Sequence, residues 1–142
     1  MARRLTKTQF HVVGAPGYLA KHGRPKIPDD LVRHNCLAVT LRDTRLARDW
    51  RFARDGVETT LTPKGNMTFS DGAALCDAVA DGYGLAQIHD YFVDDAVIAG
   101  KLVPMLERFR PAVDPIWLVY PQTRHLAPKV RAFIDFMTSR SR

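Results

Sequence analysis

Three groups of side chains stand where predicted strands end, and their types suit the binding of a small ligand. The groups are Thr40, Leu41 and Arg42; Phe69, Ser70 and Asp71; and Gln87, Ile88 and His89. Hydroxyl, amide, imidazole and guanidinium groups can all donate hydrogen bonds, and a guanidinium holds a carboxylate through two of them. We therefore expect a site for a small anion, most simply a carboxylate, with His89 at its rim.

The expected fold would bring these groups together. In α/β sheets, ligands bind outside the carboxyl ends of the parallel strands, where the chain leaves the sheet. Ser70 and Asp71 also precede a predicted helix, and the N-terminus of a helix carries a partial positive charge that attracts anions. Two simpler roles stay open: Asp71 could cap that helix, and Arg42 could pair with Asp43 or with solvent.

The residues that would serve covalent or metal chemistry lack the necessary pattern. Cys36 and Cys76 lack CxxC spacing and lie in apolar stretches, which favours two small buried side chains. Ser70 is outside a G-x-S-x-G motif, and the five histidines have no metal-ligand spacing. We expect no catalytic residue, no metal site and no cofactor. An α/β enzyme that uses Cys36 or Asp71 is the alternative.

Short strands and helices must position the candidate site. Apolar runs predict strands, and apolar residues that recur every three to four positions predict helices. Asp55-Gly56 between two alternating runs predicts an antiparallel hairpin. The order indicates an α/β fold with a mixed, largely parallel sheet and a hairpin insertion. The predicted strands are 10–13, 36–40, 50–52, 57–61, 67–69, 85–88, 102–106 and 116–120, and helices are predicted after 15, 71, 90 and 127.

Length and composition agree with a folded globular protein. The 142 residues suffice for one domain or two small lobes, with 46% apolar and 25% charged residues. No apolar run approaches the roughly 18 residues that span a bilayer. The basic start, residues 1–7, is not followed by the apolar segment of a secretory signal. We expect a cytoplasmic protein without a membrane partner.

The basic charge is dispersed rather than gathered into one block. Lys and Arg number 21 against 15 Asp and Glu, which gives a formal net charge of +6. Between residues 42 and 55, arginines alternate with aspartates, unlike the uninterrupted basic arms that bind nucleic acid. The pattern favours a solvated, mildly basic surface.

The last predicted helix carries an apolar stripe that needs a cover. Val130, Phe133, Ile134 and Met137 follow the i, i+3, i+4, i+7 spacing of one helix face. Either another copy of the chain covers this stripe, or the helix packs against the chain in its own way. We expect self-association.

Several sequence strings together resemble the effector-binding domain of LysR-type transcriptional regulators. Their order and spacing across residues 9–138 carry the resemblance, rather than any single string. The strings are 12–19, 30–37, 50–52, 70–72, 82–86, 100–103, 119–121 and 124–128.

The resemblance implies a fold and a function. It implies Rossmann-like lobes of the type 2 periplasmic-binding-protein fold, with a small effector in the cleft between two lobes. Residues 10–113 would form the second lobe, and 114–142 would return to an incomplete first lobe as a strand and a helix. The chain would be the ligand-sensing domain of a bacterial regulator, working as a dimer and modulating transcription. A free-standing small-molecule-binding module is the alternative.

The sequence also departs from the family's pattern. The winged helix-turn-helix through which the family binds promoter DNA has no counterpart in these residues. Ala127 replaces the usual Ser or Thr before the last helix, which predicts a weaker helix cap. His89 stands where the family commonly has Pro, which changes the polarity expected for the pocket.

Overall fold

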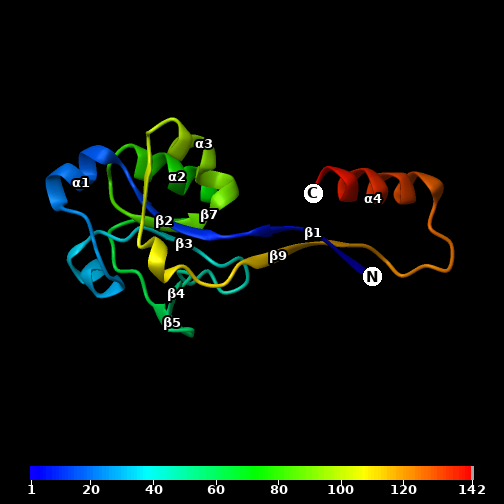
Figure 1. Cartoon of the computed structure of the whole chain (residues 1–142), viewed down its shortest axis with the longest axis horizontal. Coiled ribbons are helices and arrows are strands. Elements are labelled where there is room, and N and C mark those ends of the chain that lie inside the picture. The colour runs from blue at the N-terminus through cyan, green and yellow to red at the C-terminus, as the bar shows by residue number, and fades with distance from the viewer. Residues whose placement is uncertain (142) are drawn as a thin grey trace. The chain divides into compact units, whose positions relative to one another are not determined.

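The chain folds into two compact units. The computed structural model describes residues 1–141. Unit 2 comprises Gln9–Ala112, and unit 1 combines Met1–Thr8 with the chain from Val113 onward (Figure 1). This division lies within one residue of the predicted lobe boundaries, and it adds the first eight residues to the return segment. Within residues 1–141, no helix is both long and apolar enough to cross a membrane.

Five strands form the sheet region of unit 2, and four of them run in the same direction. They are β2 (Phe10–Gly14), β3 (Ala38–Val39), β6 (Thr68–Phe69), β7 (Ala86–His89) and β8 (Val103–Met105). Strand β2 pairs antiparallel with both β7 and β8, whereas β3 pairs parallel with β6. A parallel bridge between Cys36 and Leu85 joins the β3 and β7 segments. The predicted mixed, largely parallel sheet is confirmed, and β2 is the strand that opposes the others.

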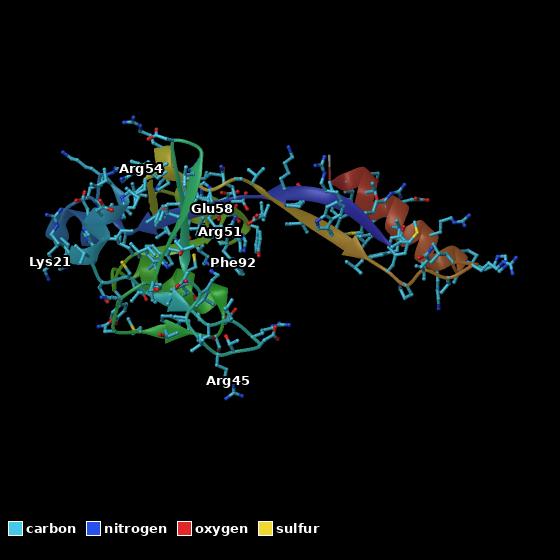
Figure 2. The ribbon with its side chains drawn as sticks, turned by 90° about the horizontal axis from the view of Figure 1, so that it is seen from below. Lys21, Arg45, Arg51, Arg54, Glu58 and Phe92 are labelled. Carbon is cyan, nitrogen blue, oxygen red and sulfur yellow. The ribbon has the colours of Figure 1, made fainter. Side chains whose placement is uncertain are left out.

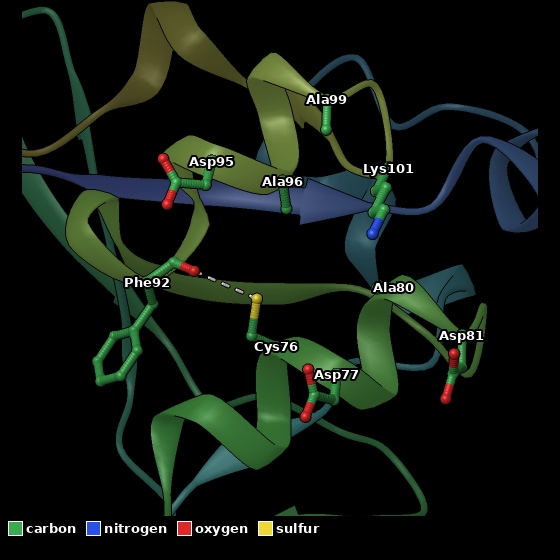
Figure 3. A pocket seen from close by; sticks show the side chains of 9 residues that line it. All are labelled: Cys76, Asp77, Ala80, Asp81, Phe92, Asp95, Ala96, Ala99 and Lys101. Carbon is green, nitrogen blue, oxygen red and sulfur yellow. Dashed lines mark hydrogen bonds between the residues drawn. The ribbon is translucent and has the colours of Figure 1, made fainter.

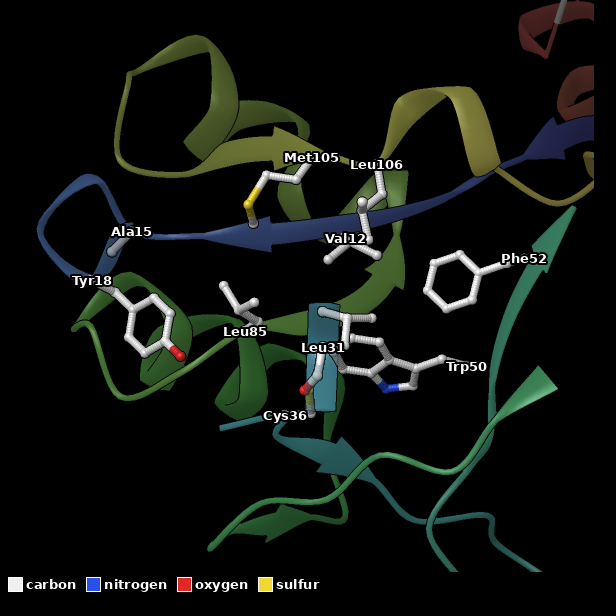
Figure 4. Close-up of a cluster of buried hydrophobic side chains, with 10 residues drawn as sticks. All are labelled: Val12, Ala15, Tyr18, Leu31, Cys36, Trp50, Phe52, Leu85, Met105 and Leu106. Atoms are coloured by element: carbon white, nitrogen blue, oxygen red, sulfur yellow. The ribbon is translucent and has the colours of Figure 1, made fainter. Parts of the chain in front are cut away.

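Both faces of the central strands are buried, which explains their continuous apolar sequences. On β2, Val12 packs into the cluster shown in Figure 4, while Val13 packs into a second cluster on the opposite face. The segment entering β7 alternates in the same way, with Leu85 in the first cluster and Ala86 in the second. The two-residue period of a strand thus builds two cores from one sheet.

Two nine-residue helices cover the face of the second cluster. These are α2 (Gly72–Ala80) and α3 (Asp90–Ile98), which bury Leu75, Val79 and Val93. Asp71 caps α2, because its carboxylate accepts hydrogen bonds from the backbone N–H groups of Ala73 and Ala74. Capping is therefore the observed role of Asp71. The unit also contains α1 (Pro16–His22) and two 3₁₀ turns, η1 (Pro28–Arg33) and η2 (Glu107–Phe109).

The predicted hairpin forms on the face of the first cluster. Strands β4 (Trp50–Arg54) and β5 (Val57–Leu61) pair antiparallel. Asp55 and Gly56 connect them with φ angles of 50° and 77°, the positive values that an Asp-Gly turn supplies. On the hairpin surface Arg51 Nε donates to Glu58 Oε1 at 2.6 Å (Figure 2).

Unit 1 is a two-stranded ribbon with one helix. Strand β1 (Ala2–Thr8) pairs antiparallel with β9 (Asp114–Val119), and α4 (Pro128–Arg140) follows. As expected, Ala127 gives α4 no side-chain cap. Of the four residues of the predicted apolar stripe, Ile134 is buried, Val130 and Met137 are half-buried, and Phe133 is 54% exposed.

Asn35 ties three segments of unit 2 together. Its Nδ2 donates to Asn66 Oδ1 and to the Tyr83 carbonyl, both at 2.8 Å. The Asn35 carbonyl accepts from the Leu85 N–H at 2.9 Å. Gly84 passes so close that a Cβ there would lie 2.4 Å from the same carbonyl oxygen. Glycine at position 84 is thus a steric requirement for the entry into β7.

The substitution Gly84→Ala is expected to destabilise the protein by about 1–3 kcal/mol, because backbone must shift to admit the methyl group. Urea unfolding, followed by the fluorescence of the buried Trp50, measures this loss. Gly17→Ala is the matched control, since a Cβ at position 17 meets no atom within 4 Å. Equal stability of the two variants would contradict the steric role of position 84.

Candidate functional site

The ends of β3, β6 and β7 carry the three predicted groups, as the sequence suggested. The Thr40 N–H donates to the Phe69 carbonyl at 2.8 Å, which joins the first two groups. Phe10, at the start of the opposing strand β2, is in register with His89 at the end of β7. The carboxyl ends of the parallel strands and the start of β2 therefore meet at one edge of unit 2.

An aromatic stack occupies this edge. The Phe10 ring lies 4.1 Å from the His89 imidazole, centroid to centroid. Tyr91 stacks on His89 at 5.1 Å, with the two rings inclined by 11°. On Phe10, the guanidinium carbon of Arg48 lies 4.4 Å from the ring centroid. The stack thus ends in a cation, and cation–π attraction contributes to holding that cation in place.

Arg48 is the main residue that the sequence analysis missed. Its backbone N–H donates to the Val39 carbonyl at 2.9 Å, and its Nη2 donates to the Gln87 carbonyl at 2.7 Å. Its Nε is buried without a hydrogen-bond partner among residues 1–141. No ion pair to an Asp or Glu is found for Arg48 within the same residues. Burial lowers the pKa of Arg48 from its usual value, yet arginine stays protonated in proteins.

Gln87 and Ile88 have structural roles. The Gln87 side chain is 2% exposed; it donates to the Arg51 carbonyl at 2.7 Å and accepts from the Arg51 N–H at 2.8 Å. The Gln87 side chain therefore links β4 to β7, because it bonds to both the N–H and the carbonyl group of Arg51, as the backbone of a neighbouring strand would. Ile88 is buried in the second cluster, on the opposite face. Within this group, His89 is the residue whose side chain joins the stack at the edge.

The N-termini of α2 and α3 lie beside this edge, and each already carries a carboxylate. Asp71 caps α2, while Ser70 beside it is exposed. Asp90 is the first residue of α3, and its Oδ1 accepts from the Tyr91 N–H at 2.8 Å while its Oδ2 accepts from the Gln9 N–H at 3.2 Å. These carboxylates offset the positive ends of the helices. An anion at this edge would consequently rely on Arg48 more than on a helix N-terminus.

Leu41 and Arg42 lie apart from the stack. Both are exposed, in a loop closed by a hydrogen bond from the Leu41 N–H to the Leu46 carbonyl at 2.8 Å. Among residues 1–141, the Arg42 guanidinium makes no hydrogen bond or ring contact that would orient it toward Arg48, Phe10 or His89. The nine predicted residues thus divide into an edge cluster, two buried residues of β7 and an exposed loop.

The cysteines are poorly suited to nucleophilic chemistry. Cys36 is 2% exposed, and burial raises the pKa of its thiol to about 11. Its Sγ lies 3.6 Å from the Leu31 carbonyl oxygen, to which it donates. Burial also raises the pKa of Cys76, whose Sγ donates to the Phe92 carbonyl at 3.4 Å. A nucleophilic cysteine needs a lowered thiol pKa and an accessible sulfur.

Known proteins resemble the chain over most of its length. The transcriptional regulator CrgA of Neisseria meningitidis (serogroup C, strain 8013) is 32% identical over 138 residues, which cover 96% of this chain and 45% of that protein. The regulator PgrR of Escherichia coli K12 is 30% identical over 124 residues, which cover 87% of this chain and 42% of that protein. The chain thus spans less than half the length of these relatives, which are transcriptional regulators rather than enzymes.

The fold is also that of solved regulatory domains. The CrgA regulatory domain from N. meningitidis superposes with a TM-score of 0.86 at 29% identity, covering all of this chain and 69% of that one. The regulatory domain of AphB from Vibrio vulnificus, at 23% identity, shares the fold with a TM-score of 0.83. The superposition covers 99% of this chain and 68% of that one. The family model of the LysR substrate binding domain matches residues 1–142. The chain therefore belongs to the LysR substrate-binding domain family, the effector-binding domain of LysR-type transcriptional regulators, with its type 2 periplasmic-binding-protein fold.

Proposed function

We propose that unit 2 binds a small carboxylate effector at the edge formed by Phe10, Thr40, Arg48, Ser70 and His89. The observation that carries this proposal is Arg48, a largely buried cation without a carboxylate partner among residues 1–141. A buried charge is costly unless it is paired, and a guanidinium can pair with a carboxylate through two hydrogen bonds. A bound carboxylate would supply the missing charge, and the neighbouring rings would contact its apolar part.

The neighbouring arginine strengthens the assignment to Arg48. Arg51 also lies over the Phe10 ring, at 5.8 Å, but it is paired with Glu58 at 2.6 Å. Of the two guanidiniums on this ring, Arg48 is therefore the one that lacks an acidic partner. Thr40 and Ser70 add hydroxyl groups at the same edge, and these suit the remaining lone pairs of a carboxylate.

In the intact regulator, unit 2 would be the second lobe and unit 1 a part of the first. Effector binding would shift the protein between conformations of different affinity for the effector, and an N-terminal helix-turn-helix domain would transmit the change to promoter DNA. The names of the relatives, HTH-type regulators, support this role. The intact protein would act in the cytoplasm as a homo-oligomer, with no catalytic step.

NMR titration with small aromatic and aliphatic acids tests the effector site. We expect shifts at Thr40, Ser70 and His89, and an affinity at least about tenfold weaker in Arg48→Met, because the main cation is lost. Arg54→Met, on the exposed end of the hairpin, is the matched control and should bind as the parent chain does. Amides of the same acids should bind poorly, since they lack the charge. Shifts that cluster elsewhere, or equal binding by Arg48→Met, would contradict the site.

Thiol labelling distinguishes a sensor from an enzyme with a cysteine nucleophile. At pH 8 a thiol with a pKa near 11 is almost entirely protonated, so native Cys36 should react with iodoacetamide far more slowly than a free cysteine. Mass spectrometry after timed labelling measures each site, and urea-unfolded protein supplies the control rate. Rapid, selective labelling of native Cys36 would support the enzyme hypothesis instead.

A further inference from the structure

A cavity of about 230 Å³ lies in unit 2, between the 3₁₀ turn η1 and the chain that leaves β5. Its apolar walls are Leu31, Val32 and Leu61, and Cys36 lies among them. Drug-sized ligands occupy sites of about 300–1,000 Å³, so this cavity suits a smaller molecule. The residues that line it all belong to unit 2, and none of them is part of the proposed effector site.

Contacts of Cys36 join the segments that form the walls. The Cys36 Sγ donates to the Leu31 carbonyl of η1 at 3.6 Å, and the Cys36 N–H donates to the Lys64 carbonyl at 3.1 Å. Gly65 packs so closely on Cys36 that a Cβ at position 65 would clash with the Cys36 carbonyl oxygen. The turn and the chain after β5 are therefore held together without a ligand, which keeps the cavity formed.

Two exposed side chains of opposite charge line the same cavity. They are Asp29 of η1 and Lys64 after β5, and neither forms an ion pair within residues 1–141. The neighbouring Asp30 differs, because its Oδ1 accepts from Arg33 at 2.9 Å and its Oδ2 accepts from two backbone N–H groups. Asp29 and Lys64 are therefore the charges that remain available to a molecule in the cavity.

The larger groove between α2 and α3 has a different charge pattern. It measures about 890 Å³, and Asp77, Asp81 and Asp95 line it with one cation, Lys101 (Figure 3). The smaller cavity instead combines one carboxylate and one ammonium group with apolar walls. A carboxylate accepts hydrogen bonds and an ammonium group donates them. This combination complements a zwitterion that carries an apolar group.

We propose that this cavity binds an α-amino acid with an apolar side chain, as a second ligand site separate from the carboxylate site. The Asp29 carboxylate accepts from the ligand's ammonium group, and Lys64 donates to the ligand's carboxylate. The side chain of the ligand lies against Leu31, Val32 and Leu61. The two charged hydrogen bonds fix the orientation of the ligand, and the apolar area that leaves water adds affinity.

Calorimetric and NMR titrations with L-valine, L-leucine and L-phenylalanine test this site. We expect binding, with amide shifts at Val32 and Leu61, and the same Kd in the parent chain and in Arg48→Met, which lacks the main cation of the effector site. Asp29→Asn and Lys64→Met should each bind about three- to tenfold more weakly, because each loses one charged contact. Both positions are exposed, so both variants should keep the parent circular dichroism spectrum.

Analogues of leucine assign each charge to its partner. 3-Methylbutylamine lacks the carboxylate, so Lys64→Met should bind it as the parent chain does. 4-Methylpentanoate lacks the ammonium group, so Asp29→Asn should bind it at this cavity as the parent chain does. Glycine lacks the apolar side chain and should bind at least about tenfold more weakly than leucine. Lys26→Met and Asp43→Asn change exposed charges outside the cavity, and as matched controls they should bind leucine unchanged.

Three results would overturn the proposal. They are no binding of any of the three amino acids, binding that Asp29→Asn and Lys64→Met both leave unchanged, and shifts at Thr40 and His89 that disappear in Arg48→Met. The third result would assign the amino acids to the effector site. Because the two sites share no residue and each has its own variants, the cavity and the effector site can fail independently.

Discussion

The two hydrogen bonds between Gln87 and the backbone of Arg51 hold the hairpin face of unit 2 in place. Gln87 is the buried polar side chain in the core of this unit, and a buried amide is costly unless its donor and acceptor are both satisfied. The backbone of β4 satisfies both. With β4 fixed, Trp50 and Phe52 complete the first cluster, and Arg48, two residues before Trp50, is placed over the ring of Phe10.

Local sequence signals predicted most of unit 2. Asp55-Gly56 predicted the hairpin because few residues accept two successive positive φ angles, and Asp71 predicted the start of α2 because a carboxylate can accept from the first free N–H groups. Strand β1 lacked such a signal. Its seven residues include Leu5 and three cations, so its pairing with β9, more than a hundred residues away, could not be predicted from its own pattern.

The sequence named residues at an edge of the sheet that the structure does form, but it did not name Arg48, the cation at that edge. The ends of apolar strands are visible in a sequence, which is why Thr40, Ser70 and His89 could be named. Arg48 lies in a charged stretch that resembles a solvated loop. Its burial depends on Phe10 and on the Gln87 carbonyl, which lie 38 and 39 residues away and have no periodic relation to it.

The same stack lies beside the two segments through which the chain passes from one unit to the other. Phe10 is the second residue of unit 2, and His11 after it accepts a hydrogen bond at Nδ1 from Arg110, which lies two residues before the end of the unit. Burial and the nearby Arg110 charge lower the pKa of His11, so the neutral ring that accepts this bond is favoured.

A ligand changes a conformational equilibrium only through a difference in its affinity for the two states. A carboxylate held by Arg48 would contact the ring of Phe10 directly, and the backbone of Phe10 continues into both the crossing segment and the His11–Arg110 pair. Phe10 alone would then connect the proposed binding edge to the segment through which the chain passes between the two units.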